Sequence, residues 1–148
     1  MQSVMLLLGA GAGVALLGLA SAALGGWRRV RLDAEAEARA RLAHAEPDFP
    51  QGPCLLDALG RAALFEAAEG TDLALVLAVG DHVAVRRFPP QAVRGARLCE
   101  RAGVAELDLR LADWTLPPVR LGADRAVLEG WARRLGAGAT VSTKGQGR

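Results

Sequence analysis

A glycine-rich turn near the start of the chain is the pattern most typical of a chemical function. Gly9 and Gly11 lie in GAGAG, directly after the apolar run VMLLL. Asp33 follows about twenty residues later, where dinucleotide-binding folds place the carboxylate that binds the ribose. The third glycine of G-x-G-x-x-G would fall at position 14, which is Val14. The motif is therefore incomplete, and a dinucleotide-binding enzyme stays open as one alternative.

Cysteine, histidine and serine side chains offer little further chemistry. Cys54 and Cys99 do not form a C-x-x-C pair, and adding His44 and His82 gives scattered ligands without the spacing of a metal site. Ser142 is the only serine after residue 24, and no P-loop or H-E-x-x-H motif is present. We therefore expect no metal, no cofactor and no catalytic activity. Five carboxylates near expected loops are interpreted as solvated surface charges: Asp57, Glu66, Glu69, Asp72 and Asp81.

Length and charge limit the class of protein. A chain of 148 residues allows one domain plus short additional segments. The 18 basic and 16 acidic residues are interspersed, the formal net charge is +2, and aromatic residues make up 4%. Nucleic-acid-binding modules concentrate basic charge and add stacking aromatics. We therefore expect no nucleic-acid partner.

The run from Val4 to Leu24 contains no charged residue. A helix needs about 20 apolar residues to cross a hydrocarbon core roughly 30 Å thick, so the run predicts a transmembrane anchor at residues 1–27. Small residues at helical spacing predict a face that contacts a second helix. The tryptophan and arginines that follow the run predict a contact with the lipid headgroups. These predicted contact residues are Gly9, Gly13, Gly18, Trp27, Arg28 and Arg29.

The charges beside this run predict its orientation. No basic residue precedes it and several arginines follow it, so the positive-inside rule places the C-terminal part in the cytoplasm. We expect a single-pass protein of a bacterial inner membrane with its N-terminus outside. The alternative is a signal peptide cleaved near Ala20-Ser21-Ala22, which would give an exported protein with a disulfide between Cys54 and Cys99.

A charged helix and a linker are expected between the anchor and the folded domain. Residues 28–46 are rich in alanine and place Glu35 with Arg39, and Glu37 with Arg41, at the i,i+4 spacing that favours a helix. We expect this helix to be mostly solvated and to act as a spacer. Residues 47–60, which include PDFPQGP, predict a linker.

Residues 61–136 predict an α+β domain. LALVLAVGDHVAVRRF predicts a hairpin that turns at Gly80-Asp81, and its first strand is apolar on both sides and should be central. VAELDLRL alternates as a half-buried antiparallel strand, 91–99 predicts a further strand, and LPPVRLG predicts an edge strand. Residues 61–68 could be strand or helix.

ADRAVLEGWARRLG predicts an amphipathic helix, capped by Asp124 and ended by Gly136, with an apolar stripe of Val127, Leu128, Trp131 and Leu135. Residues 137–148 predict a disordered tail.

A small antiparallel sheet or barrel followed by one C-terminal helix resembles the pleckstrin-homology-like domains of small bacterial membrane proteins. The resemblance rests on LALVLAVGDHVAVRRFP, VAELDLRL and the helix with Trp131. It implies binding of lipid headgroups, peptides or protein neighbours without catalysis. Five strands can be read in this sequence, and that family has seven.

The last candidate site is a group of arginines that could attract anionic lipid from the cytoplasmic leaflet. We therefore expect a non-catalytic, membrane-anchored interaction module, serving as an accessory or assembly subunit of a membrane complex. Its expected partners are the bilayer and a protein in the membrane. The predicted arginine contacts are Arg86, Arg87, Arg94 and Arg97, with Arg101 beside them.

Overall fold

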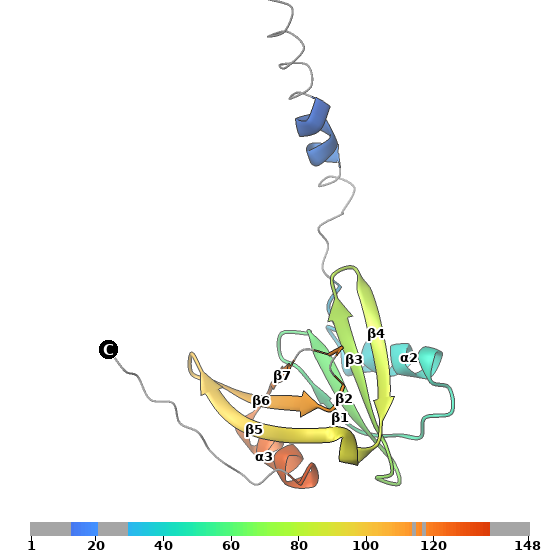
Figure 1. The fold of residues 1–148 in the computed structure, drawn as a ribbon, viewed down its shortest axis with the longest axis vertical. Coiled ribbons are helices and arrows are strands. Elements are labelled where there is room, and N and C mark those ends of the chain that lie inside the picture. Colours follow the sequence, from blue (N-terminus) through green and yellow to red (C-terminus); the bar gives the residue numbers. More distant parts are fainter. Residues whose placement is uncertain (1–12, 21–29, 114, 117, 137–148) are drawn as a thin grey trace, which may run out of the picture.

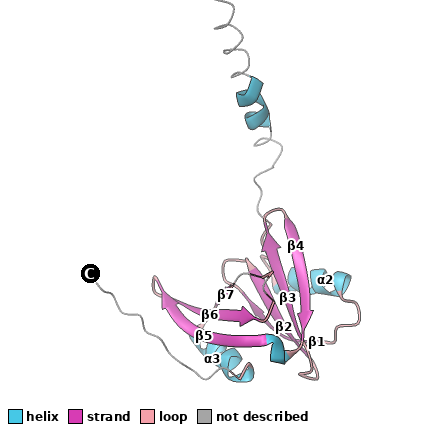
Figure 2. Ribbon diagram, in the orientation of Figure 1, coloured by secondary structure: helices cyan, strands magenta, loops and turns pink. Residues whose placement is uncertain are grey.

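The computed structural model describes residues 13–20, 30–113, 115, 116 and 118–136. Within these ranges the chain is an α+β protein with two small antiparallel sheets, which Figures 1 and 2 show crossing one another. The helix α2 (Glu35–Ala45) lies beside the first sheet, and the helix α3 (Arg125–Arg134) lies under the second (Figure 1). The expected fold class is thus confirmed at the level of an α+β domain with a C-terminal helix.

The first sheet is a meander in the order β1-β2-β3-β4. Its strands are β1 (Gln51–Leu56), β2 (Ala62–Ala67), β3 (Leu73–Val79) and β4 (His82–Phe88). The β3 strand is central, as its two apolar faces predict. The β3–β4 turn lies at Gly80-Asp81 as expected, and Gly80 has a φ of +62°, which glycine adopts at no steric cost.

The second sheet has the order β5-β6-β7 and follows a short 3₁₀ helix, η1 (Pro90–Ala92). Its strands are β5 (Val93–Arg101), β6 (Val104–Leu111) and β7 (Val119–Gly122). The alternation of β6 is confirmed for its apolar side, because Leu107 and Leu109 are fully buried in the core, whereas Glu106 on the other side is buried as well. The β7 strand lies at an edge, as its preceding prolines predict.

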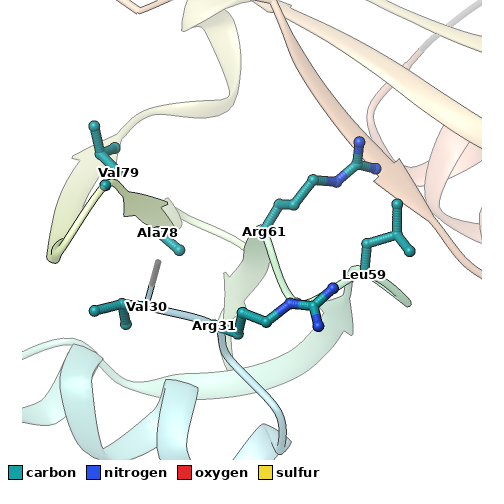
Figure 3. Close-up of a pocket in the computed structure, with 8 residues that line it drawn as sticks. Val30, Arg31, Leu59, Arg61, Ala78 and Val79 are labelled. Carbon is teal, nitrogen blue, oxygen red and sulfur yellow. The ribbon is translucent and has the colours of Figure 1, made fainter. Parts of the chain in front are cut away.

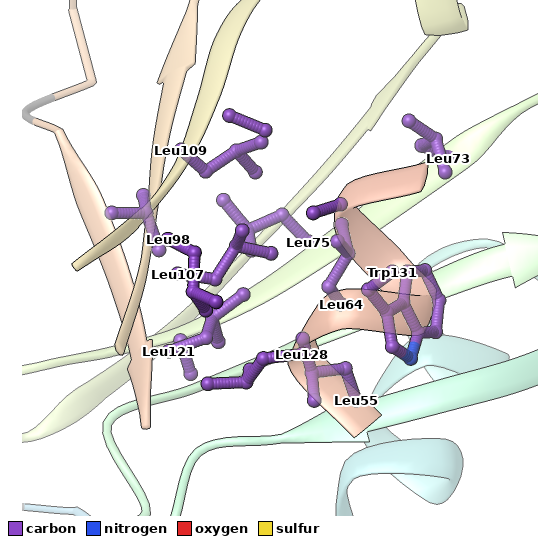
Figure 4. Close-up of a cluster of buried hydrophobic side chains, with 14 residues drawn as sticks. Leu55, Leu64, Leu73, Leu75, Leu98, Leu107, Leu109, Leu121, Leu128 and Trp131 are labelled. Carbon is purple, nitrogen blue, oxygen red and sulfur yellow. The ribbon is translucent and has the colours of Figure 1, made fainter. Parts of the chain in front are cut away.

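The main core lies between the two sheets and α3 (Arg125–Arg134), as Figure 4 shows. Leu64 and Leu75 of the first sheet meet Leu107 of the second, and Trp131 of α3 closes the cluster. Asp124 caps α3 as predicted, because its side chain accepts a 2.9 Å hydrogen bond from the Ala126 N–H. Val127 was predicted to belong to the buried apolar stripe of α3, and this was wrong, because Val127 is 46% exposed. The buried residues of α3 are Leu128, Trp131 and Ala132.

The helix α2 (Glu35–Ala45) is mostly exposed, as expected, but it packs against the first sheet through Ala38 and Leu42 and is therefore not a separate spacer. Leu32, Ala38 and Leu42 are buried together with Phe49 against the face of the sheet that points away from the main core. That face is built mainly of alanine, phenylalanine and valine, so a helix with few large side chains can approach it closely. Ala38 is the one alanine of α2 that is buried in this contact, and the other alanines of the helix are exposed.

Two strands occupy residues where the sequence indicated a linker or an ambiguous element. The β1 strand falls within the expected linker 47–60, and β2 resolves residues 61–68 as strand. The β1 pattern is obscured by a register shift between Gln51 and Cys54, where Gly52 allows the strand to approach Glu66. The described residues thus contain seven strands, two more than can be read from the sequence.

The predicted anchor lies largely outside the described residues. Residues 13–20 of the run are helical. Among the described residues, no helix combines the length and hydropathy needed to cross a bilayer. The tail expected at residues 137–148 also lies outside the described ranges.

Replacing Leu42 with alanine tests whether α2 belongs to the folded domain. Leu42 is 0% exposed, so Leu42→Ala should lower the free energy of unfolding by about 2–4 kcal/mol. The measurement is urea unfolding of the full chain in mild detergent, monitored by circular dichroism. The control is Val104→Ala at the half-exposed first residue of β6, which should change that energy by less than about 0.5 kcal/mol. Equal effects of the two substitutions would contradict the docked helix.

Candidate functional site

The arginines expected to attract lipid do not form one patch. Arg86 and Arg87 are neighbours in β4 and therefore point to opposite faces of the first sheet. Arg87 binds Asp72 at 2.6 Å and lies over the ring of Phe49, 5.6 Å from its centroid. Its charge is thus used within the domain.

Arg94 and Arg97 belong to β5 in the second sheet. Arg97 lies opposite Asp108 of β6 in the register. The four arginines are therefore distributed over both sheets. Strand alternation could have indicated from the sequence that Arg86 and Arg87 face opposite ways.

The predicted helix-contact residues divide between described and undescribed parts of the chain. Gly13 and Gly18 lie in the helical residues 13–20, and no described atom beyond the backbone of that helix lies within 4 Å of the place that a Cβ would take on either. Gly9, Trp27, Arg28 and Arg29 lie outside the described residues.

The most constrained polar group is Asp57, which the sequence indicated as a solvated charge. It follows β1 and is only 1% exposed. Its Oδ2 accepts hydrogen bonds from the Arg61 backbone N–H at 3.1 Å and Nε at 2.7 Å, and its Oδ1 accepts from Arg61 Nη2 at 3.0 Å. Oδ1 also accepts from the Gly122 N–H at 2.8 Å. The expectation was wrong because Gly122, far away in the sequence, covers this carboxylate.

These contacts form the Asp57 clamp, defined by Asp57, Arg61 and Gly122. The Ala58 N–H donates a 2.7 Å hydrogen bond to the Gly122 carbonyl, so the connection runs in both directions between the two segments. The turn between β1 and β2 is thereby joined to the edge strand β7. The clamp ties the two sheets together at one corner.

The charge state of Asp57 follows from its partners. Burial raises the pKa of the carboxyl, but hydrogen bonds from the Arg61 side chain and from the Gly122 and Arg61 backbones outweigh burial and hold the pKa below its usual 3.8. Asp57 is therefore ionised at neutral pH. It serves as a structural anion and is not suited to donate a proton at neutral pH.

A second carboxylate adjoins the clamp on the second sheet. Glu106 is 8% exposed, and its Oε1 lies 3.5 Å from Arg61 Nη2. Its Oε2 and the Oδ1 of Asp108 have no hydrogen-bond partner among the described residues. Two carboxylates thus share one arginine whose side chain is 45% exposed, which weakens each pairing by solvent screening.

A pocket of about 840 Å³ opens beside the clamp (Figure 3). Three segments border it: the chain entering the domain at Val30, the β1–β2 turn, and the β3–β4 turn. The Val30 N–H donates to the Gly80 carbonyl at 2.9 Å, and the Leu32 N–H donates to the Gly60 carbonyl at 2.8 Å. Gly60 has a φ of +66°, and a Cβ there would lie 3.1 Å from the Leu32 carbonyl oxygen, so glycine permits this close approach.

The pocket has an apolar side and a basic side. Figure 3 shows Val30, Ala78 and Val79 on one side, while Arg31 and Arg61 extend on the other toward Leu59. The lining contains no carboxylate. Arg61 is occupied by Asp57, whereas Arg31 forms no ion pair with any described residue. Arg31 is therefore the cation available to an anionic ligand.

A smaller cavity of about 200 Å³ adjoins this pocket. Arg31, Leu59 and Gly60 line both cavities, and the smaller one adds Asp33 and Asp57. Sequence reasoning missed this site, because its walls come from three segments that meet only after the sheets have formed.

Both cysteines are thiols and lie on different sheets, so the structure does not form the disulfide of the export alternative. Burial, with the charge of Glu35, raises the pKa of Cys54 to about 12 against the opposing effect of Arg39. Burial also raises the pKa of Cys99. Neither sulfur is a ready nucleophile at neutral pH.

The remaining candidate chemistries find no support in the described residues. No group of three His, Cys, Asp or Glu side chains there could hold a metal ion. All described strand pairs are antiparallel, whereas a dinucleotide-binding fold requires parallel strands joined by helices. The glycines Gly9 and Gly11 lie outside the described residues.

Comparison with known proteins identifies no relative: no family model, curated protein or solved structure matches the chain. The fold and the site geometry are therefore the basis for any functional assignment.

The Asp57 clamp can be tested with Asp57→Asn, which keeps an oxygen for the Gly122 N–H but removes the charge that binds Arg61. Because Arg61 is half exposed, we expect a loss of about 1–3 kcal/mol in the free energy of unfolding at pH 7. The measurement is urea unfolding of the full chain. Asp81→Asn, at an exposed turn, is the matched control and should leave that energy unchanged. Indistinguishable variants would contradict the clamp.

The same carboxylate predicts a pH dependence. The folded pKa of Asp57 is lower than the usual 3.8, so its ionisation stabilises the fold fully above that value. Stability should fall as the pH drops through 3.8 toward the lower folded pKa. The difference between the original chain and Asp57→Asn should therefore shrink from pH 6 to about pH 3. A difference that stays constant over this range would show that ionised Asp57 contributes nothing.

Proposed function

We propose that this protein is a non-catalytic, membrane-anchored interaction module of a bacterial inner membrane. The observation that carries the proposal is the hydrogen bond from the Val30 N–H to the Gly80 carbonyl. It fixes the chain to one end of the domain six residues after Leu24, where the uncharged run ends. A domain held this close to an apolar run of membrane-spanning length works at the membrane surface.

The exposed apolar side chains of the run support the anchor. Val14, Leu16, Leu17 and Leu19 are each about 70% exposed within the helical residues 13–20. Leu16 and Leu17 are consecutive and point in directions about 100° apart, so a narrow contact on one side would not cover both. A lipid environment would cover all four.

The state of the titratable groups supports a binding role over a catalytic one. Asp57 is ionised and engaged by Arg61 and Gly122, and the pKa of the Cys54 thiol is raised to about 12. These groups stabilise the fold. What the domain offers a ligand is shape and one cation, Arg31, at a pocket that opens beside the entering chain.

The topology supports a pleckstrin-homology-like architecture. The described chain has a four-stranded and a three-stranded antiparallel sheet followed by α3, which matches the seven strands and C-terminal helix expected of that family. The resemblance implies recognition of lipid headgroups, peptides or protein neighbours. We propose that the domain recruits or positions a membrane partner, as an accessory or assembly subunit of a larger complex.

Membrane fractionation combined with a topology reporter tests the anchor. The full chain with a C-terminal cytoplasm-active fluorescent protein should fluoresce and stay in the membrane after carbonate washing. A chain starting at Val30 should also fluoresce but should not stay in the membrane. A matched pair, Leu16→Arg within the run and Val127→Arg on the surface of α3, should lose and keep membrane retention respectively. A signal from a C-terminal phosphatase, with a mature chain lacking about the first two dozen residues, would favour the export alternative.

A further inference from the structure

The exposed apolar side chains of the folded domain include a pair at the end where the chain enters. Leu59, in the β1–β2 turn, is 52% exposed, and Val79, at the end of β3, is 57% exposed. Both line the pocket that Val30 and Arg31 complete, as Figure 3 shows. The half-exposed Val104 and Val127 are outside this pocket, in the β5–β6 hairpin and in α3.

The length of the entering chain limits how far this end can lie from the anchor. Six residues from Leu24 to Val30 span at most about 20 Å even when fully extended. The polar layer of a bilayer is about 5–8 Å thick on each side. Because the Val30 N–H is bound to the Gly80 carbonyl, this end is the part of the folded domain that lies closest along the chain to the apolar run.

The chemistry of this end suits a lipid interface. Leu59 and Val79 offer apolar tips, and Arg31 offers a cation that no described residue pairs. The carboxylate of Asp81, which follows Gly80, would be repelled by an anionic surface. It is exposed in the turn, and its Oδ1 lies 3.2 Å from His82 Nε2. Arg28 and Arg29, which precede Val30 in the sequence, add positive charge to the same short tether.

We propose that Arg31, Leu59 and Val79 form a lipid-docking surface that lies in the headgroup layer of the membrane holding the anchor. Leu59 and Val79 reach the boundary with the acyl chains, and Arg31 binds the phosphate of an anionic lipid. The inference rests on the proposed function, because it requires the anchor. It adds that the domain has a fixed orientation, with the β1–β2 and β3–β4 turns facing the bilayer.

Site-specific fluorescence tests the docking surface. In a full chain with Cys54→Ala and Cys99→Ala, single substitutions Leu59→Cys, Val79→Cys and, as control, Val104→Cys carry a polarity-sensitive dye. The proteins are reconstituted into vesicles of phosphatidylcholine and phosphatidylglycerol with or without doxyl-labelled lipid. Dyes at positions 59 and 79 should shift to the blue and lose fluorescence to the doxyl lipid, whereas the dye at position 104 should do neither. Circular dichroism confirms that each variant folds.

The outcomes separate the two proposals. If the protein floats with the vesicles but the three dyes respond alike, the anchor stands and the docking surface is wrong. If the full chain does not float with the vesicles, the proposed function itself fails.

The role of Arg31 is tested in the same vesicles with Arg31→Glu. Reversing this charge changes it by two units, so it should lower the equilibrium constant for docking, read from quenching at position 79, by roughly thirtyfold when phosphatidylglycerol is present. The matched control Arg133→Glu, at an exposed position of α3, should leave quenching unchanged. Equal quenching in both variants would overturn the assignment of Arg31 as the lipid cation.

Discussion

The domain depends on the hydrogen bonds that Asp57 receives. A carboxylate removed from water is costly unless the protein supplies donors, and Asp57 receives four, three from Arg61 and one from Gly122. Because Gly122 belongs to β7 and Asp57 follows β1, this requirement is met only when the two sheets are together. The ion pair therefore specifies the corner of the fold as well as stabilising it. The β1–β2 turn that borders the pocket is held in place by the same contacts.

The first sheet is buried on both faces, and this explains the position of the entering chain. Its inner face belongs to the main core, and its outer face is covered by Leu32, Leu42 and Phe49. Leu32 is thus anchored twice, through its side chain in this second cluster and through its N–H at Gly60. The segment that enters the domain is part of the folded structure from Val30 onward, well before the boundary expected at residue 61.

The elements that could be predicted from the sequence are those whose pattern is local. The apolar strand β3, the Gly80-Asp81 turn, the alternation of β6 and the cap of α3 by Asp124 all follow from neighbouring residues. The features that could not be predicted depend on distant pairs. Asp57 and Gly122 are 65 positions apart, and nothing near Asp57 indicates that it will be buried. The same holds for α2, because nothing near Ala38 and Leu42 in the sequence indicates that the first sheet will bury them.

The hydrogen bond between Val30 and Gly80 also bears on how strong any contact of this domain needs to be. In the proposed arrangement, a tether of six residues confines the domain to a thin shell over the bilayer, which corresponds to an effective concentration in the millimolar range. Encounters with lipids or membrane proteins in that shell are then nearly intramolecular. Contacts too weak to hold a free domain are sufficient there, so a single arginine and two apolar tips can do what a freely diffusing protein would need a larger recognition surface to achieve.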